Sequence, residues 1–251
     1  MKPIFEKSYT IRDCDVDRYG YLTPARTLFF AQDVAGDHCT ALSVDYDALA
    51  KKQLFWAVVR HRVQVSRYPR QGEKITVQTW PMPTTRSAYP RSTVAYDEKG
   101  NELFRAISLW VLMDMATRAM ILPGKSGVEV NGVLLGSELA VPGSMSLTPA
   151  PNACSRTVVF SDLDRNGHMN NCRYLQWVSD LLPSAFHAGN RAKEFTICYH
   201  CEAREGQQLK LTWALSDGPI LSVDGLREDA AASTGHSRVF SVRMLFESGV
   251  L

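Results

Sequence analysis

An internal repeat is the feature that most constrains the fold of this chain. Residues 17–33, DRYGYLTPARTLFFAQD, align without a gap to residues 164–180, DRNGHMNNCRYLQWVSD, and six of the seventeen positions are identical. The segments that follow also correspond, since FWAVVRHRVQV (55–65) is answered by FTICYHCEA (195–203). Each copy has to bury its own apolar residues, so we expect two similar folding units in one chain.

Both copies predict the same order of elements: a strand, a turn, one long helix and then several strands. In the first copy Thr23 is a good N-cap and Pro24 suits the first helical turn. In the second copy Asn170 or Asn171 is the expected N-cap, and Pro183 marks the expected end of the helix. The leading strands are expected at 7–13 and 153–160.

These patterns predict an α+β architecture in which each unit wraps an antiparallel sheet around a long helix. A stretch rich in Gly, Ser and Pro separates the copies and is typical of a connector rather than of a core element. The predicted organisation is therefore an N-terminal unit at 1–123, a linker at 124–152 and a C-terminal unit at 153–251.

Composition excludes several classes of protein. A net charge of only +2 does not favour a nucleic-acid-binding protein. The longest apolar run, residues 107–113, is too short to span a bilayer, and the first residues lack a signal-peptide core. We therefore expect a cytoplasmic protein with six reduced cysteines. CYHC (198–201) is half of a zinc motif without a second pair, so we expect core cysteines and no metal.

The repeat provides an internal control for the polar cluster at the start of the second helix. Asn166 and His168 occupy positions that hold Tyr19 and Tyr21 in the first copy, so the fold of the unit does not require Asn and His there. His168 precedes a helix whose unpaired N–H groups favour negative charge. An imidazole in that place, oriented by a carboxylate, can take a proton from water near neutral pH.

Both copies also keep an aspartate and a glycine in this turn. Asp17 and Gly20 in the first copy match Asp164 and Gly167 in the second. Aspartate bonds its own backbone in tight turns, and glycine supplies a positive φ. These two residue types are therefore expected to serve the turn itself.

Three segments resemble the acyl-acyl carrier protein (ACP) thioesterases, the plant plastid enzymes and their bacterial relatives. DLDRNGHMNNCRYLQW (162–177) resembles the D-x-N-x-H-x-N-N segment of that family. RHRVQVSRYPRQGEKITVQTW (60–80) and ISLWVLMDMATRAMILP (107–123) resemble two first-half segments of the family. The likeness covers most of residues 7–215 and implies a tandem hotdog fold.

The resemblance implies a set of catalytic residues. The catalytic Asp, Asn and His of the family fall on Asp164, Asn166 and His168, and its glutamate falls on Glu202. The cysteine that follows this glutamate in the family is Ala203 here, which leaves no thiol for a Cys–His mechanism at that position. Attack by water, assisted by Glu202 and His168, is the mechanism that these residues imply.

The direction of Glu202 stays open in the sequence. Strict alternation through residues 194–203 would point Glu202 away from the face that carries Tyr199 and Ala203. A β-bulge would turn the side chain toward the site. Without a bulge, Glu202 is a surface charge.

The implied activity is hydrolysis of the thioester of fatty acyl-ACP, without a metal or an organic cofactor. A thioesterase for acyl-CoA is the alternative enzyme, and a non-hydrolytic acyl-binding module is the alternative of another class. By the resemblance, the acyl chain enters the first unit near Phe29 and Phe30, and Asn170 contacts the substrate.

The implied partner is an acidic acyl carrier protein. Residues 1–125 contain 18 Lys and Arg against 13 Asp and Glu, whereas the remainder contains 10 against 13. The candidate docking residues in this basic half are Arg60, Arg62, Arg67 and Arg70. A solvated strand face explains these arginines equally well. Two hotdog units in one chain are compatible with a monomer or a homodimer, and neither nucleic acid nor a membrane span is expected.

Overall fold

A computed structural model of the protein describes residues 3–146, 150–228 and 238–249. Contacts between Cα atoms divide the chain into two units, Met1–Pro142 and Gly143–Leu251. The division falls inside the linker expected at 124–152. Residues 229–237 and 250–251, which the sequence assigns to the second unit, lie outside the described residues.

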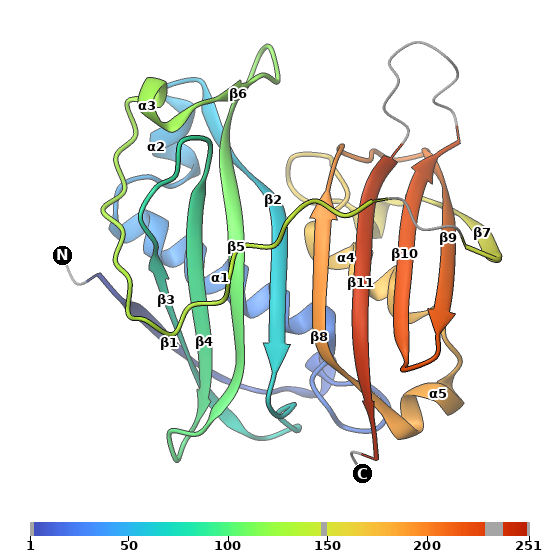
Figure 1. Cartoon of the computed structure of the whole chain (residues 1–251). Coiled ribbons are helices and arrows are strands. Elements are labelled where there is room, and N and C mark those ends of the chain that lie inside the picture. The colour runs from blue at the N-terminus through green and yellow to red at the C-terminus, as the bar shows by residue number, and fades with distance from the viewer. Residues whose placement is uncertain (1–2, 147–149, 229–237, 250–251) are drawn as a thin grey trace. The chain divides into compact units, whose positions relative to one another are not determined.

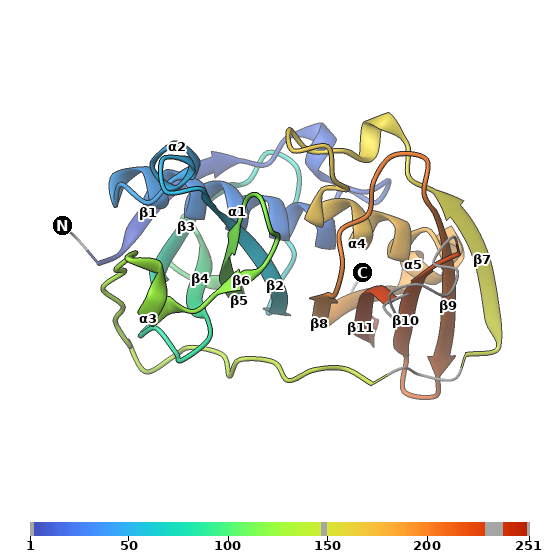
Figure 2. The same cartoon turned by 90° about the horizontal axis from the view of Figure 1, so that it is seen from above.

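In the first unit, an antiparallel sheet has the long helix α1 against one face (Figures 1 and 2). Its helices are η1 (Asp13–Asp15), α1 (Pro24–Ala41), α2 (Tyr46–Ala50) and α3 (Pro123–Ser126). Its strands are β1 (Phe5–Thr10), β2 (Leu54–Val65), β3 (Lys74–Pro81), β4 (Tyr89–Asp97), β5 (Glu102–Asp114) and β6 (Met120–Ile121). The strand order is β1-β3-β4-β5-β2, and β6 pairs with β5.

The second unit repeats the order of strands β1 to β5 of the first unit. Its helices are η2 (Phe160–Asp162), α4 (Asn171–Ser179) and α5 (Ser184–Gly189). Its strands are β7 (Asn152–Thr157), β8 (Asn190–Tyr199), β9 (Gln208–Ser216), β10 (Ile220–Arg227) and β11 (Arg238–Ser248). The order β7-β9-β10-β11-β8 is that of the first unit with each strand replaced by its counterpart. The predicted α+β architecture with a duplicated unit is therefore confirmed.

Helix α1 begins where the sequence predicts. Thr23 is the N-cap, and its hydroxyl accepts a hydrogen bond from the Arg26 amide at 3.3 Å, while Pro24 occupies the first helical position. The face of the helix toward the sheet consists of small and aliphatic side chains that are almost completely buried. They include Ala25, Leu28, Ala31, Val34 and Ala35. Capping and burial together account for a helix of 18 residues.

The helix of the second unit begins and ends close to the positions that the sequence predicts. Asn170 is the N-cap of α4, with its side-chain oxygen 2.9 Å from the Cys172 amide, and the helix ends after nine residues at Ser179. Pro183 has no N–H to donate to the Ser179 carbonyl, so the helix cannot continue through it. The chain turns instead, and α5 starts after Pro183. Helix α4 therefore ends four residues before Pro183, close to the end that the sequence predicts.

The first part of the expected connector belongs to the core of the first unit. Val128 is 7% exposed and joins a buried cluster with Leu49, Leu54, Tyr89 and Leu112. The Tyr89 hydroxyl also donates to the Val128 carbonyl at 3.2 Å. The sequence around Val128 is rich in Gly, Ser and Pro, which predicts a connector. Because Val128 packs into the core, the connector interpretation is wrong here.

The turn before α1 and the turn before α4 have the same hydrogen bonds. In each, one carboxylate oxygen, on Asp17 or Asp164, accepts the backbone amides two and four residues further along, at 2.8 and 3.2 Å. Gly20 and Gly167 lie inside these turns with φ of 77° and 75°, where a side chain would be strained. The aspartate and the glycine are thus parts of the fold of both units.

We predict that Asp17→Ala and Asp164→Ala each lower the free energy of unfolding by about 1 to 3 kcal/mol, because each change leaves two amides without their acceptor. Chemical denaturation of both variants measures this loss. Asp17→Asn and Asp164→Asn are the matched controls, since an amide oxygen still accepts and should retain part of the stability. A loss confined to one of the two turns would contradict their equivalence.

Candidate functional site

His168 and Glu202 form an imidazole–carboxylate pair close to the start of α4. The distance from His168 Nε2 to Glu202 Oε2 is 3.1 Å, and the two side chains are 16% and 40% exposed. A carboxylate oxygen accepts hydrogen bonds, so this distance fits a bond in which the Nε2–H group of His168 donates to Glu202. The pair is therefore arranged to exchange a proton with a group that reaches the ring from solvent.

A β-bulge after β8 brings Glu202 to this position. The amides of His200 and Cys201 both donate to the Val239 carbonyl, at 2.7 and 3.2 Å. Two successive residues opposite one residue of the neighbouring strand are the mark of a bulge, and they end the strict alternation of the strand. Glu202 consequently contacts His168, while its side chain remains 40% exposed.

The segment after the bulge is bonded to the turn that carries the histidine. His168 forms an isolated β-bridge with Arg204, and the Met169 amide donates to the Ala203 carbonyl at 2.8 Å. Ala203 is completely buried, and its methyl group stands where the resembling family has a thiol. Backbone pairing, rather than side-chain contact alone, therefore holds His168 and Glu202 together.

The first unit has the same backbone with different side chains. The amides of Ser66 and Arg67 both donate to the Leu103 carbonyl, at 2.9 and 3.1 Å, and Tyr21 is bridged to Arg70. Tyr21 thus corresponds to His168. The Arg70 guanidinium donates to the Tyr21 hydroxyl and lies 4.4 Å from its ring centroid.

Tyr68 occupies the place of Glu202 in the first unit, and it is only 6% exposed. A phenol there cannot supply the carboxylate that faces His168. The first unit therefore has the framework of the site without the imidazole–carboxylate pair.

Asp164 and Asn166 are placed differently from each other. The Asp164 carboxylate accepts the amides of Asn166 and His168, so it fixes the histidine through its backbone. Asn166 is exposed at the tip of the turn. The four predicted residues thus lie in one segment and its bonded neighbour, with His168 and Glu202 in direct contact.

The first turn of α4 provides a hydrogen-bond donor. The Asn170 amide donates to the Asp162 carbonyl, and the amides of Cys172 and Arg173 donate to Asn170 itself. The remaining amide of this turn is that of Asn171, and it donates a hydrogen bond to no atom of the described residues. Asn170, which the sequence assigned to substrate binding, uses its side-chain oxygen as the helix cap.

A cavity of about 170 Å³ lies in the first unit, between α1, α2 and the sheet. Its walls are mainly aromatic and aliphatic, with one buried cation. The residues that define it here are Cys39, Trp56, Tyr89, Arg91, Trp110 and Val130. Half-buried aromatic residues in strands are usual in any core, so the sequence offered no signal for this cavity.

The predicted acyl-chain residues do not line that cavity. Phe30 is buried against Tyr9, with ring centroids 4.6 Å apart, and Phe29 is 39% exposed under the Arg26 guanidinium at 3.8 Å. The cavity lies along a later part of the same helix. The assignment of Phe29 and Phe30 to the acyl chain therefore stays a prediction, which this cavity does not support.

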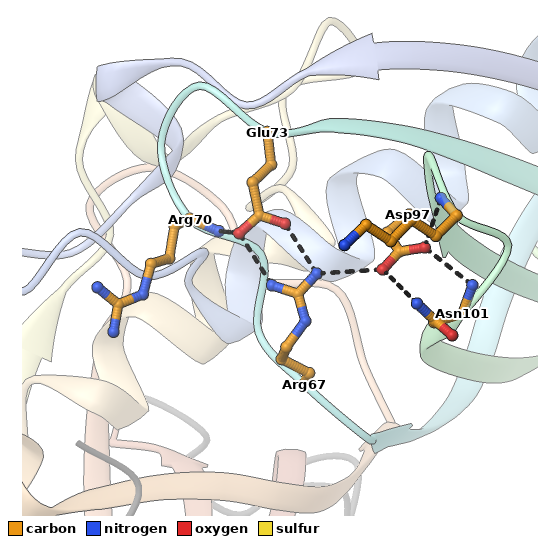
Figure 3. A network of polar contacts seen from close by, with 6 residues as sticks. Arg67, Arg70, Glu73, Asp97 and Asn101 are labelled. Carbon is orange, nitrogen blue, oxygen red and sulfur yellow. Dashed lines mark hydrogen bonds and ion pairs between the residues drawn. The ribbon is translucent and has the colours of Figure 1, made fainter.

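Of the four candidate docking arginines, Arg67 forms ion pairs with carboxylates of its own unit (Figure 3). Its guanidinium donates to both carboxylate oxygens of Glu73 at 2.9 and 2.8 Å and lies 3.6 Å from Asp97, which Asn101 also binds. The hydrogen bond from Arg67 holds the pKa of Glu73 below its ordinary value. Figure 3 shows the Arg70 guanidinium pointing away from this network.

The other two arginines are half-buried on β2. Arg60 donates to the Pro142 carbonyl at 3.0 Å, and Arg62 is partly covered. Arg67 and Arg70 are therefore the two exposed residues of the four, and Arg67 is paired with Glu73 and Asp97.

Arg204 and Arg227 border the site but were not singled out in the sequence. Arg204 is bridged to His168, and Arg227 Nη2 donates to the Glu202 carbonyl at 3.2 Å. Arg204 has the place of Arg70 in the second unit, so comparison of the two copies could have identified Arg204. In the described parts of the chain, no three His, Cys, Asp or Glu side chains form a metal-binding group, and no helix is long and apolar enough to cross a bilayer.

Sequence comparisons match both units to one family. The model described as acyl-ACP thioesterase N-terminal domain matches residues 2–122, and the C-terminal domain of that family matches residues 149–237. A palmitoyl-ACP thioesterase of Gossypium hirsutum is 27% identical over 229 residues, which are 85% of this chain and 55% of the relative. A dodecanoyl-ACP hydrolase of Umbellularia californica is 23% identical over 230 residues, covering 86% and 60%. The chain spans little more than half the length of these relatives.

Solved structures have the same fold. An acyl-ACP thioesterase of Bacteroides thetaiotaomicron superposes with a TM-score of 0.87 at 24% identity, over 98% of both chains. A 12:0-ACP thioesterase of Umbellularia californica gives 0.82 at 22% identity, over 99% of both chains. The tandem hotdog fold is thereby confirmed. With its two halves matched in order by the two domains of the family, the chain belongs to the acyl-ACP thioesterases.

Proposed function

We propose that this chain hydrolyses the thioester of fatty acyl-ACP and releases a free fatty acid and the carrier protein. The observation that carries the proposal is the 3.1 Å contact between His168 and Glu202 in front of α4. Its relatives are named as thioesterases or hydrolases of palmitoyl-, dodecanoyl- and oleoyl-ACP. Their names differ in the acyl chain, so they support the substrate class and the role in fatty acid synthesis rather than a chain length.

The first step is attack of water on the thioester carbonyl carbon. His168 and Glu202 act together as the general base, because Nδ1 takes a proton from the water while the carboxylate stabilises the imidazolium through Nε2–H. Positioned proton transfer of this kind typically contributes about 10² to 10⁴-fold to a rate. A buried methyl group at Ala203 supports direct attack by water over an acyl-enzyme at that position.

The second step is collapse of the tetrahedral intermediate. Its oxyanion needs a preorganised donor, and the Asn171 amide at the positive end of α4 is suited to that role. The carbon–sulfur bond then breaks, and the imidazolium returns its proton to the sulfur. Asp164 keeps the turn and the histidine in place, and Asn166 positions water or substrate from the tip of the turn.

The apolar cavity of the first unit offers space for hydrocarbon and supports a lipid substrate. The reaction is proposed to occur in the cytoplasm. The six cysteines, all within the described residues, form no disulfide, which suits a reducing compartment, while the word chloroplastic belongs to the names of the plant relatives.

We predict that His168→Ala and Glu202→Gln each lower kcat for acyl-ACP hydrolysis by at least about 10²-fold, because each removes one half of the proton-transfer pair. Release of the carrier thiol measures the rate. The melting temperature of His168→Ala should change little, since a partly exposed side chain contributes about 1 kcal/mol or less.

Tyr21→Phe is the matched control, because Tyr21 has the place of His168 in the first unit. It should hydrolyse acyl-ACP at nearly the rate of the unchanged protein. Turnover that survives in His168→Ala would remove this residue from the mechanism.

Docking of the acidic carrier protein is proposed to use the basic surface of the first unit. Arg70 is exposed, whereas the charge of Arg67 is balanced by Glu73 and Asp97. Arg70→Gln should therefore raise KM for acyl-ACP by roughly threefold or more at low salt, and Arg67→Gln should affect stability more than KM. Kinetics at two salt concentrations test both variants.

An acyl-CoA thioesterase would use the same chemistry, so the competition between the two thioesters decides the substrate. Acyl-ACP should be favoured at low salt and should lose part of that advantage as salt screens the docking charges. Preference for acyl-CoA that is independent of salt would favour the alternative.

A further inference from the structure

The cavity of the first unit contains a buried guanidinium. Arg91, on β4, is 6% exposed and lines the cavity. Its Nη1 is 3.0 Å from His38 Nδ1 and 3.3 Å from Thr79 Oγ1, and its Nη2 is 3.9 Å from Cys39 Sγ. Arginine stays charged in proteins, so the wall of an otherwise apolar cavity carries a full positive charge.

The neighbours of this cation are neutral. Burial, together with the charge of Arg91, lowers the pKa of His38 to about 4, so its ring is neutral at physiological pH. Burial raises the pKa of the Cys39 thiol, which therefore stays protonated. No carboxylate of the described residues is within ion-pair distance of Arg91. A buried charge without a counterion is costly, and it favours an anion supplied from outside.

The rest of the cavity indicates what kind of anion fits. Trp56, Tyr89 and Trp110 give broad apolar walls, which suit an aliphatic chain rather than a phosphate or a sugar. Asp45 is the carboxylate on the wall, but it caps α2 by accepting the Ala48 amide at 3.0 Å. A ligand anion is therefore directed to Arg91 and away from Asp45.

We infer that this cavity binds an aliphatic chain that ends in a carboxylate, with the carboxylate on Arg91 and the chain against the aromatic walls. A carboxylate matches the planar fork of a guanidinium and gives strong, charge-assisted hydrogen bonds. The inference goes beyond the proposed function, because it concerns binding in the first unit and needs no hydrolysis. Two ligands have this chemistry: a free fatty acid, and an acyl thioester whose far end carries a carboxylate.

Binding of decanoate and of decanol at pH 8 separates a carboxylate site from an apolar slot of the same length. The fluorescence of Trp56 and Trp110, which line the cavity, and calorimetry report binding. Decanoate should bind about ten- to a hundredfold more tightly than decanol, the range expected for hydrogen bonds to a charged group. His168→Ala should keep this preference, since its change lies in the second unit. Equal affinity for the two ligands would overturn the inference.

Arg91→Met is the decisive variant, and it should bind the two ligands equally. Arg91→Lys keeps the charge without the fork, so it should retain part of the preference. Unchanged preference in Arg91→Met would also overturn the inference. A measurement on the unchanged protein covers the case in which Arg91→Met does not fold: with carboxyl-labelled decanoate, NMR should detect contact between the label and the Arg91 guanidinium, and its absence in the bound state counts against the site.

Kinetics then distinguish the two sources of the carboxylate. If the free acid is the ligand, decanoate inhibits hydrolysis of decanoyl-ACP at concentrations where decanol does not. If the far end of the substrate is the ligand, the thioester of a dicarboxylic acid is hydrolysed with at least tenfold higher kcat/KM than its monocarboxylic counterpart. Absence of both effects alongside equal binding overturns the inference, whereas failure of all hydrolysis with selective binding of decanoate overturns only the proposed function.

Discussion

The bond between one aspartate carboxylate and two backbone amides is the constraint on which both units depend. It closes the turn before α1 through Asp17 and the turn before α4 through Asp164, with the same distances. The closed turn pairs with the segment that follows a β-bulge on the neighbouring strand. The backbone of each unit therefore brings one residue of the turn close to one residue after the bulge, whatever side chains these two residues have.

The two units use these facing positions differently. In the first unit they are held by Tyr21, whose hydroxyl accepts a hydrogen bond from Arg70, and by the buried Tyr68, so neither an imidazole nor a carboxylate is present. His168 and Glu202 in the second unit are a donor and an acceptor that can exchange a proton. The same framework thus becomes a site in one copy through the exchange of a few side chains, which is why comparison of the copies in the sequence already singled out His168.

Local signals in the sequence were sufficient for the architecture and for the turn that carries His168. The caps Thr23 and Asn170 and the shared aspartate act on their own neighbours, so their effect is readable from a few residues. The direction of Glu202 was not readable, because the bulge depends on a carbonyl of the distant Val239. The place of Phe30 likewise depended on Tyr9, a partner that helical spacing cannot reveal.

Charge is treated differently in the two units, and this difference bears on what each can do. Glu202 is 40% exposed, so both water and His168 can compensate the charge of its carboxylate. Arg91 is 6% exposed among neutral groups, where solvent cannot compensate it. Such a fixed charge is unsuited to proton transfer but well suited to selecting a ligand by its terminal group. The proposed reaction in the second unit and the inferred recognition in the first therefore rest on one exposed charge and one buried charge.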